Sequence, residues 1–241
     1  MSWNQPSWNQ SSLSSPQLAD VRDERVGAFL SKVYGWMFVG LLVTAVTAFS
    51  VASSPAMIEI VFRNRPVFWL LLIAQLGLVF YLSARVDKVA PATAAGLFIL
   101  YSALMGVTSS VILLVYTGAS ITSTFIITAG MFGATAVFGT VTKRSLAGLG
   151  QFLFMGLIGL IIAMVVGFFW QSDALQFVIS VVGVLVFTGL TAWDAQRLKQ
   201  MAVALPDGRV GAYAVVGALS LYLDFINLFF FLLRFTGNRR N

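Results

Sequence analysis

The sequence predicts an all-α integral membrane protein with seven transmembrane helices. Of its 241 residues, 59% are hydrophobic and 10% are charged, and the mean hydropathy is +0.89. Soluble domains carry about 25% charged residues. The chain also contains seven apolar runs near the length of about 20 residues that a helix needs to cross a hydrocarbon core of about 30 Å.

The predicted spans lie within a membrane domain at residues 22–236. They cover residues 27–51, 66–84, 92–116, 120–141, 149–170, 174–196 and 211–233. Charged residues, proline or glycine separate the runs, and these residues interrupt helices or place the chain in water. Pro66 and Pro91 fall in the first turn of a helix, where proline is tolerated. Small residues four apart, such as Ala129 with Gly133 and Ala163 with Gly167, predict close packing between helices.

Two polar tails flank the predicted membrane domain. Residues 1–21 begin with a Ser-, Asn-, Gln- and Pro-rich segment that predicts disorder, and this segment lacks the apolar stretch of a signal peptide. Trp3 and Trp8 lie in this tail and are candidates for contact with headgroups or a partner protein. Residues 237–241 form a basic C-terminal tail.

Lysine and arginine are distributed unequally between the two sides that alternating spans define. The side of the N-terminus carries ten and the other side carries five. The positive-inside rule therefore predicts a cytoplasmic N-terminus and an external C-terminus. The net charge of +6 is then a topological signal with contacts to anionic headgroups. It does not indicate nucleic-acid binding, which needs basic residues on one soluble face.

Cysteine and histidine are both absent, and their absence excludes several chemistries. Disulfides, Cys/His metal sites and Ser-His or Cys-His nucleophiles all need one of these residues, and the thiolate and imidazole ligands of iron–sulfur and haem sites are absent too. No lysine lies in the middle of a span to form a Schiff base, and no phosphate-binding loop of the G-x-x-x-x-G-K-[ST] type is present. We therefore expect no cofactor and no enzymatic activity.

Two carboxylates remain as candidates for function because they fall inside predicted spans. Asp224 lies in the middle of the last span, and Asp194 lies near the inner end of the sixth. A charged carboxylate at the bilayer centre costs about 2.5 to 3.5 kcal/mol on insertion scales, and such residues commonly face a polar interior and carry function.

The helical neighbours of both aspartates are polar. Ser220 and Asn227 share one helix face with Asp224 and with Gly217, and Thr188 and Thr191 share one with Asp194. Because the two spans are consecutive and antiparallel, the pattern predicts that these polar faces meet around a wet interior.

Two carboxyl groups in contact share a proton, since ionising both is unfavourable. Doubly ionised, Asp194 and Asp224 would present oxygen ligands suited to transient calcium binding. Two cations compete as partners of Asp194. Arg85 closes the second span on the same side, and Arg197 lies three residues away on the same helix.

Three segments resemble motifs of the Bax inhibitor-1 family. They are residues 188–199 (TGLTAWDAQRLK), 217–229 (GALSLYLDFINLF) and 124–132 (TFIITAGMF). Lys143 and Arg144, followed by residues 148–162, resemble the bacterial branch, and the resemblance extends over residues 22–236.

The resemblance implies a central last helix wrapped by two layers of three helices. It also implies a pH-sensitive calcium leak channel in a bacterial inner membrane. In that family pattern Asp194 and Asp224 form a hydrogen-bonded, proton-sharing sensor, and Arg85 latches the gate. Trp193 and Ala195 stand where the family often has Tyr and Thr, so we expect the surroundings of Asp194 to differ.

Two other functions compete with the leak. One is a membrane adaptor that regulates a membrane protease or a stress response through its tail and loops, without transport of its own. The other is an intramembrane aspartyl protease, which needs a Gly-x-Gly-Asp turn, whereas Asp224 follows Leu221-Tyr222-Leu223. The sequence favours the leak over both.

Overall fold

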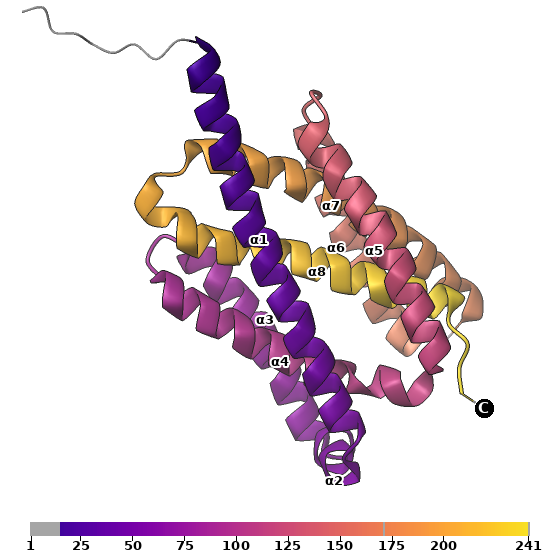
Figure 1. Ribbon diagram of the computed structural model, residues 1–241. Coiled ribbons are helices and arrows are strands. Elements are labelled where there is room, and N and C mark those ends of the chain that lie inside the picture. The colour runs from indigo at the N-terminus through magenta and orange to yellow at the C-terminus, as the bar shows by residue number, and fades with distance from the viewer. Residues whose placement is uncertain (1–14, 171, 241) are drawn as a thin grey trace, which may run out of the picture.

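The computed structural model describes residues 15–170 and 172–240, and helices make up its regular secondary structure. Seven helices in this part of the chain are long and apolar enough to cross a membrane (Figure 1). They are α1 (Ser15–Ala52), α3 (Arg65–Arg85), α4 (Pro91–Val115), α5 (Gly118–Val141), α6 (Ala147–Phe169), α7 (Asp173–Ala204) and α8 (Val210–Thr236). The all-α membrane fold and its seven predicted spans are confirmed.

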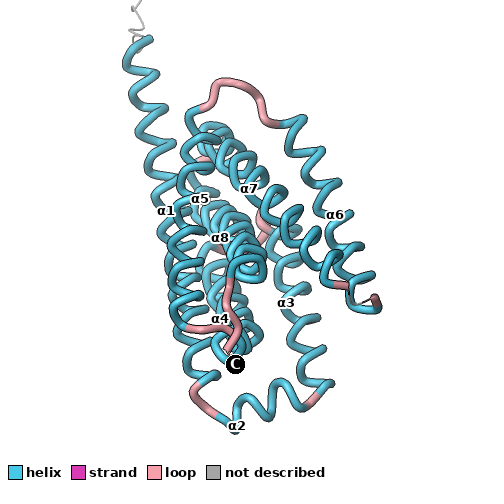
Figure 2. The backbone as a smooth tube through the Cα atoms, turned by 90° about the vertical axis from the view of Figure 1, so that its right-hand side faces the viewer, coloured by secondary structure: helices cyan, strands magenta, loops and turns pink. Residues whose placement is uncertain are grey.

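Short elements and side-chain caps make the connections. The helix α2 (Pro55–Ile58) and a π-helical turn, η1 (Glu59–Arg63), join α1 to α3, and a 3₁₀ turn, η2 (Asp207–Arg209), precedes α8 (Figure 2). Thr117 and Ser172 accept hydrogen bonds from backbone N–H groups in the first turns of α5 and α7. Such caps satisfy donors that have no partner within their own helix.

The helix α8 lies at the centre of the bundle. It packs directly against α1, α4, α5 and α7, whereas α3 packs mainly on α4 and α6 packs on α7 (Figures 1 and 2). The helices α1, α3 and α4 therefore form one group around α8, and α5, α6 and α7 form the other. Buried residues cover most of the circumference of α8 and leave one half-buried stripe that includes Val216, Ser220 and Leu223, whereas on α5 they occupy one face.

Two predicted helix boundaries differ from the structure. Residues 15–21, predicted as part of the disordered tail, belong to α1, where Pro16 falls in the first turn; residues 1–14, with Trp3 and Trp8, lie outside the described residues. The helix α7 continues to Ala204, beyond the predicted end at residue 196. The first helix breaker after Asp194 is Pro206, and the residue before a proline avoids the helical conformation.

The C-terminal tail is held against the loop between α4 and α5. The Thr117 N–H donates to the Asn238 carbonyl at 3.1 Å, and the Arg240 N–H donates to the Val115 carbonyl at 2.8 Å. These bonds fix residues 237–240 on the side of the membrane opposite the start of α1.

Some of the glycines at close helix contacts belong to the predicted small-residue pairs, and others do not. Gly167 packs against Gln176 of α7, as the pair with Ala163 predicts. Gly133 faces open space, so the predicted contact of the Ala129–Gly133 pair within this chain is wrong. The face of α5 that packs inward instead ends at Gly139, which approaches the Ala192 carbonyl of α7.

Gly139→Ala is expected to destabilise the protein. An added Cβ atom would overlap the Ala192 carbonyl oxygen, and because that oxygen is backbone, α5 and α7 must separate. Overpacking of this kind costs about 1 to 3 kcal/mol. Gly133→Ala is the matched control, since it adds the same methyl group to open space on the same helix. Unfolding of the two purified variants in detergent measures the difference, and equal stability would contradict the close α5–α7 contact.

Candidate functional site

The two intramembrane aspartates lie on the packed pair α7 and α8. Asp194 is 9% exposed and Asp224 is 5% exposed. Each projects from a helix whose neighbouring residues are buried, and α7 and α8 form one of the most extensive contacts of the bundle. Both carboxyl groups are therefore inside the protein rather than in lipid.

Two close contacts set the register between α7 and α8. A Cβ atom at Gly217 would lie 2.5 Å from the Leu198 side chain, and one at Gly183 would lie 2.6 Å from the Phe231 ring. For antiparallel helices in this register, Asp224 is level with residues 190 and 191. Asp194 then lies about one helical turn, or roughly 5 Å along the axis, from Asp224. The predicted meeting of the two polar faces fits this register.

The two carboxyl groups lie on facing helices, about one helical turn apart by the α7–α8 register, without a direct bond. No hydrogen bond joins them within the described part of the chain. Oδ2 of Asp224 is buried and has no hydrogen-bond partner there. A buried polar atom without a partner carries a desolvation penalty of about 1 to 3 kcal/mol. The hydrogen-bonded sensor pair stays a prediction.

Arg197 is the cation beside Asp194. Its Nη1 atom lies 3.9 Å from Oδ1 of Asp194, and its guanidinium carbon lies 5.5 Å from the centre of the Trp193 ring. The Trp193 ring in turn lies against Gly150 of α6, where a Cβ atom would overlap it. Trp193 thus supports the arginine on one side, and the absence of a side chain at Gly150 makes room for the ring.

Arg85, the other predicted partner, does not pair with Asp194 in the described structure. It is the last residue of α3, is exposed, and forms no ion pair with a carboxylate in residues 20–170 and 172–240. Of the two predicted partners of Asp194, Arg197 is the one that lies beside it in the structure. The latch role of Arg85 stays a prediction.

The other predicted polar residues bond within their own helices. Thr188 donates to the Val184 carbonyl at 2.6 Å, and Thr191 donates to the Phe187 carbonyl at 2.8 Å. Asn227 donates to the Leu223 carbonyl at 2.8 Å, and Ser220 is half-buried. Such bonds use the donor protons but leave lone pairs on the oxygens, so the side chains can still face a cation.

The carboxylates do not form a resident metal site. No group of three or more Asp, Glu, His or Cys side chains gathers anywhere in residues 15–170 and 172–240. Calcium takes six to eight oxygen ligands, and Asp194 with Asp224 supply at most four carboxylate oxygens. The pair suits a passing cation better than a permanently bound one.

Comparison with known proteins shows the family of the chain. Residues 26–241 match the family described as inhibitor of apoptosis-promoting Bax1. The chain belongs to the Bax inhibitor-1 family.

Bacterial relatives in this comparison cover nearly the whole chain. The inner membrane protein YbhL of Escherichia coli strain K12 is 49% identical over 230 residues, which are 93% of this chain and 98% of the relative. An uncharacterized protein of Borreliella burgdorferi is 47% identical over 215 residues, 88% of this chain and 93% of its own. The similarity to YbhL and the seven apolar helices support a multi-pass protein of the inner membrane.

A second buried polar contact in this member of the Bax inhibitor-1 family, the one between Tyr222 and Thr44, was not predicted from the sequence. The Tyr222 hydroxyl lies 2.6 Å from Oγ1 of Thr44 in α1, and that Oγ1 also lies 3.0 Å from the Ser102 carbonyl of α4. The Tyr222 ring contacts Phe98 and Tyr101 edge-on, with centroids 5.7 and 5.9 Å apart. A tyrosine in the middle of an apolar span was the available signal, since a buried hydroxyl needs a partner.

Tyr222 and Asp224 point to opposite sides of α8. Residues two apart on a helix are separated by about 200°, and the partners confirm the geometry. Tyr222 contacts α1 and α4, whereas Asp224 interacts with Asp194 of α7. The central helix therefore presents Tyr222 to one of the two surrounding helix groups and Asp224 to the other.

Tyr222→Phe is expected to lower the free energy of unfolding by about 1 kcal/mol, because it removes the hydrogen bond to Thr44 and keeps the ring contacts. Tyr81→Phe, at a tyrosine that is 47% exposed on α3, should change it little. Unfolding of the purified protein in mixed micelles measures both. In a double-mutant cycle, Thr44→Val should have a smaller effect in the Tyr222→Phe background than in the wild type, and additive effects would contradict the contact.

Proposed function

We propose that this protein is a passive, pH-sensitive cation leak of the inner membrane, with calcium as cargo and the Asp194–Asp224 pair as its gate. The observation that carries the proposal is the burial of Asp224. Its carboxyl lies at the centre of the bundle beside another carboxyl, with one oxygen atom that has no hydrogen-bond partner in the described structure. The proposal contains no catalytic step.

The pair acts through a shared proton. Two carboxylates in a site of low polarity repel each other, so one proton stays on the pair and neutralises half of its charge. Loss of that proton as the pH rises leaves two negative charges in the core. These charges attract a cation and weaken the packing of α7 against α8, so the leak opens toward higher pH.

The two aspartates have different roles in this mechanism. Arg197 lies beside Asp194 and provides the positive charge that favours its ionised form. The charged group that acts on Asp224 is Asp194 itself. We therefore assign the shared proton to Asp224 and the permanent charge to Asp194.

The orientation follows from the distribution of basic residues. The positive-inside rule places the N-terminus in the cytoplasm and the C-terminus outside. Asp194 lies ten residues before the end of α7 on the N-terminal side, so the gate would respond mainly to cytoplasmic pH.

Asp224→Asn should remove the pH response. Asparagine cannot lose a proton, so flux above neutral pH should fall at least about tenfold, because the second charge no longer attracts the cation. Calcium entry into liposomes that contain the purified protein and an internal calcium dye measures the flux. Glu24→Gln, an exposed carboxylate outside the pair, is the control. Unchanged flux and pH profile for Asp224→Asn would contradict the proposal.

Arg197→Gln and Arg85→Ala distinguish the two candidate cations. Without Arg197, Asp194 holds a proton more readily, so the pH midpoint of the flux should rise by about half a unit to one unit, an effect limited by the 53% exposure of the Arg197 side chain. If Arg85 is the latch, Arg85→Ala should raise flux at acidic to neutral pH. The same liposome assay measures both variants. An unchanged midpoint for Arg197→Gln excludes its role, and unchanged flux for Arg85→Ala leaves Arg85 as a topological signal.

The adaptor alternative depends on the N-terminal tail. Its supporting feature was the pair Trp3 and Trp8, which lie outside the described residues. The structure therefore adds no observation in favour of binding to a membrane protease.

A further inference from the structure

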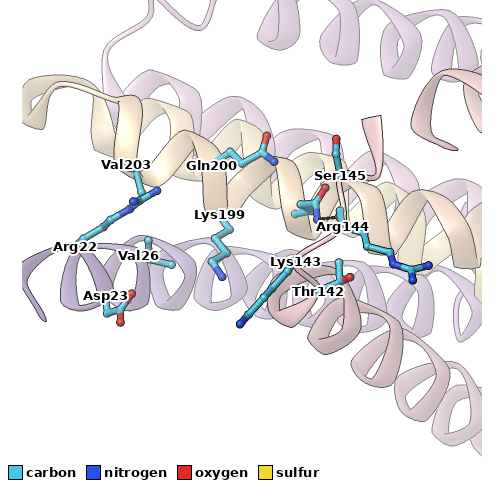
Figure 3. A pocket seen from close by; sticks show the side chains of 11 residues that line it. Arg22, Asp23, Val26, Thr142, Lys143, Arg144, Ser145, Lys199, Gln200 and Val203 are labelled. Carbon is cyan, nitrogen blue, oxygen red and sulfur yellow. Dashed lines mark hydrogen bonds between the residues drawn. The ribbon is translucent and has the colours of Figure 1, made fainter. Parts of the chain in front are cut away.

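A basic pocket opens at the end of the bundle where the chain begins. It has a volume of about 670 Å³ and lies between the first turns of α1, the α5–α6 loop and the last turns of α7 (Figure 3). Its charged lining residues are Arg22, Asp23, Lys143, Arg144 and Lys199. Four cations and one carboxylate leave a net charge of +3, although the three contributing segments are far apart in sequence.

The α5–α6 loop is held in place beside this pocket. Gln196 of α7 accepts a hydrogen bond from the Leu146 N–H at 2.7 Å and donates to the Arg144 carbonyl at 2.9 Å. Lys199 donates to the Thr140 carbonyl at 2.7 Å. These three bonds fix the backbone that carries Lys143 and Arg144, so the cations are presented by a defined loop.

Most of the positive charge in the pocket has no ion-pair partner among the residues that the structure describes. The Lys199 ammonium group donates one hydrogen bond to the Thr140 carbonyl, near the end of α5. Arg22, Lys143 and Arg144 form no ion pair in the described part of the chain. In Figure 3 the Lys143 and Lys199 ammonium groups extend to the same side of the pocket, toward α1. Cations gathered in this way repel each other unless an anion lies between them.

Exposed apolar residues of α5 lie next to the pocket in sequence. Thr142 lines it, and Phe138, one helical turn earlier on the same face of α5, is 56% exposed. Val141, next to Thr142, is also exposed. Exposed apolar side chains in the last turn of α5 and the cations of the adjoining loop therefore lie close along the chain, and a phospholipid has apolar tails and an anionic headgroup that match them.

We propose that this pocket binds the phosphate of an anionic phospholipid in the leaflet on the N-terminal side, with the acyl chains against Phe138 and Val141. Lysine and arginine form charge-assisted hydrogen bonds with phosphate, and basic pockets between helices bind anionic headgroups. A headgroup in this position holds α1, the α5–α6 loop and α7 together. Gln196 lies only two residues after Asp194, so the lipid stabilises the end of α7 that supports the gate.

Thermal unfolding of the full-length protein in detergent tests the proposal, because a ligand that binds the folded state raises the unfolding temperature. The probes are dioctanoyl phosphatidylglycerol, dioctanoyl phosphatidylcholine and inorganic phosphate. We expect a saturable rise with phosphatidylglycerol, a much smaller one with phosphatidylcholine, and at least a tenfold weaker half-saturation by phosphate alone.

The Lys143→Gln/Arg144→Gln variant tests the location of the site. It should weaken the half-saturation by phosphatidylglycerol at least tenfold, while Lys32→Gln/Lys88→Gln, which removes two positive charges outside the pocket on the same predicted side, should leave it unchanged. Phosphate that binds as tightly as phosphatidylglycerol would assign the pocket to a soluble anion and overturn the lipid proposal. Equal loss in both double variants, or no shift with any probe, would also overturn it.

Discussion

The burial of most of α8 is the constraint on which the rest of the structure depends. A polar group on the buried faces of this helix has neither lipid nor water around it, so it needs a partner within the protein. The Tyr222 hydroxyl forms a hydrogen bond with Thr44 of α1, in one helix group. Asp224 lies on the side of α8 that faces the other group, and one of its oxygen atoms has no hydrogen-bond partner in the described structure. The same burial that organises the fold leaves an incompletely satisfied site at its centre.

The fold was predictable from sequence where the physical cause is local. A run of apolar residues is sufficient to place a helix in lipid, and Pro66 and Pro91 mark helix starts because proline lacks an N–H group. The helix faces were less predictable, because a contact depends on which residues of two helices meet. The pair Ala129–Gly133 has the spacing of a packing motif but lies on the outer face of α5, whereas Gly139 makes the close approach to α7.

For the candidate site too, the sequence predicted the individual residues better than their contacts. Asp194 and Asp224 were identifiable because a carboxylate in a membrane span is unfavourable wherever the helix lies. Their partners were not identifiable with equal certainty. Arg85 and Arg197 both satisfied the topology, and only side-chain positions distinguish the local pair at 3.9 Å from the exposed end of α3. The Thr44–Tyr222 contact joins residues that are 178 positions apart, so no local pattern could reveal it.

The two carboxyl groups are chemically unequal, and this inequality determines how a shared proton can act. A symmetric pair would distribute the proton evenly and respond to pH from either side. Asp194 lies beside Arg197 and nearer the N-terminal end of the bundle, whereas Asp224 lies in the middle of α8 and forms no ion pair in the described part of the chain. In the proposed mechanism, a proton that leaves Asp224 passes Asp194 or leaves when α7 and α8 separate. Loss of the proton is linked in this mechanism to movement of the helices, because a buried charge without a partner is unfavourable until water or a cation enters.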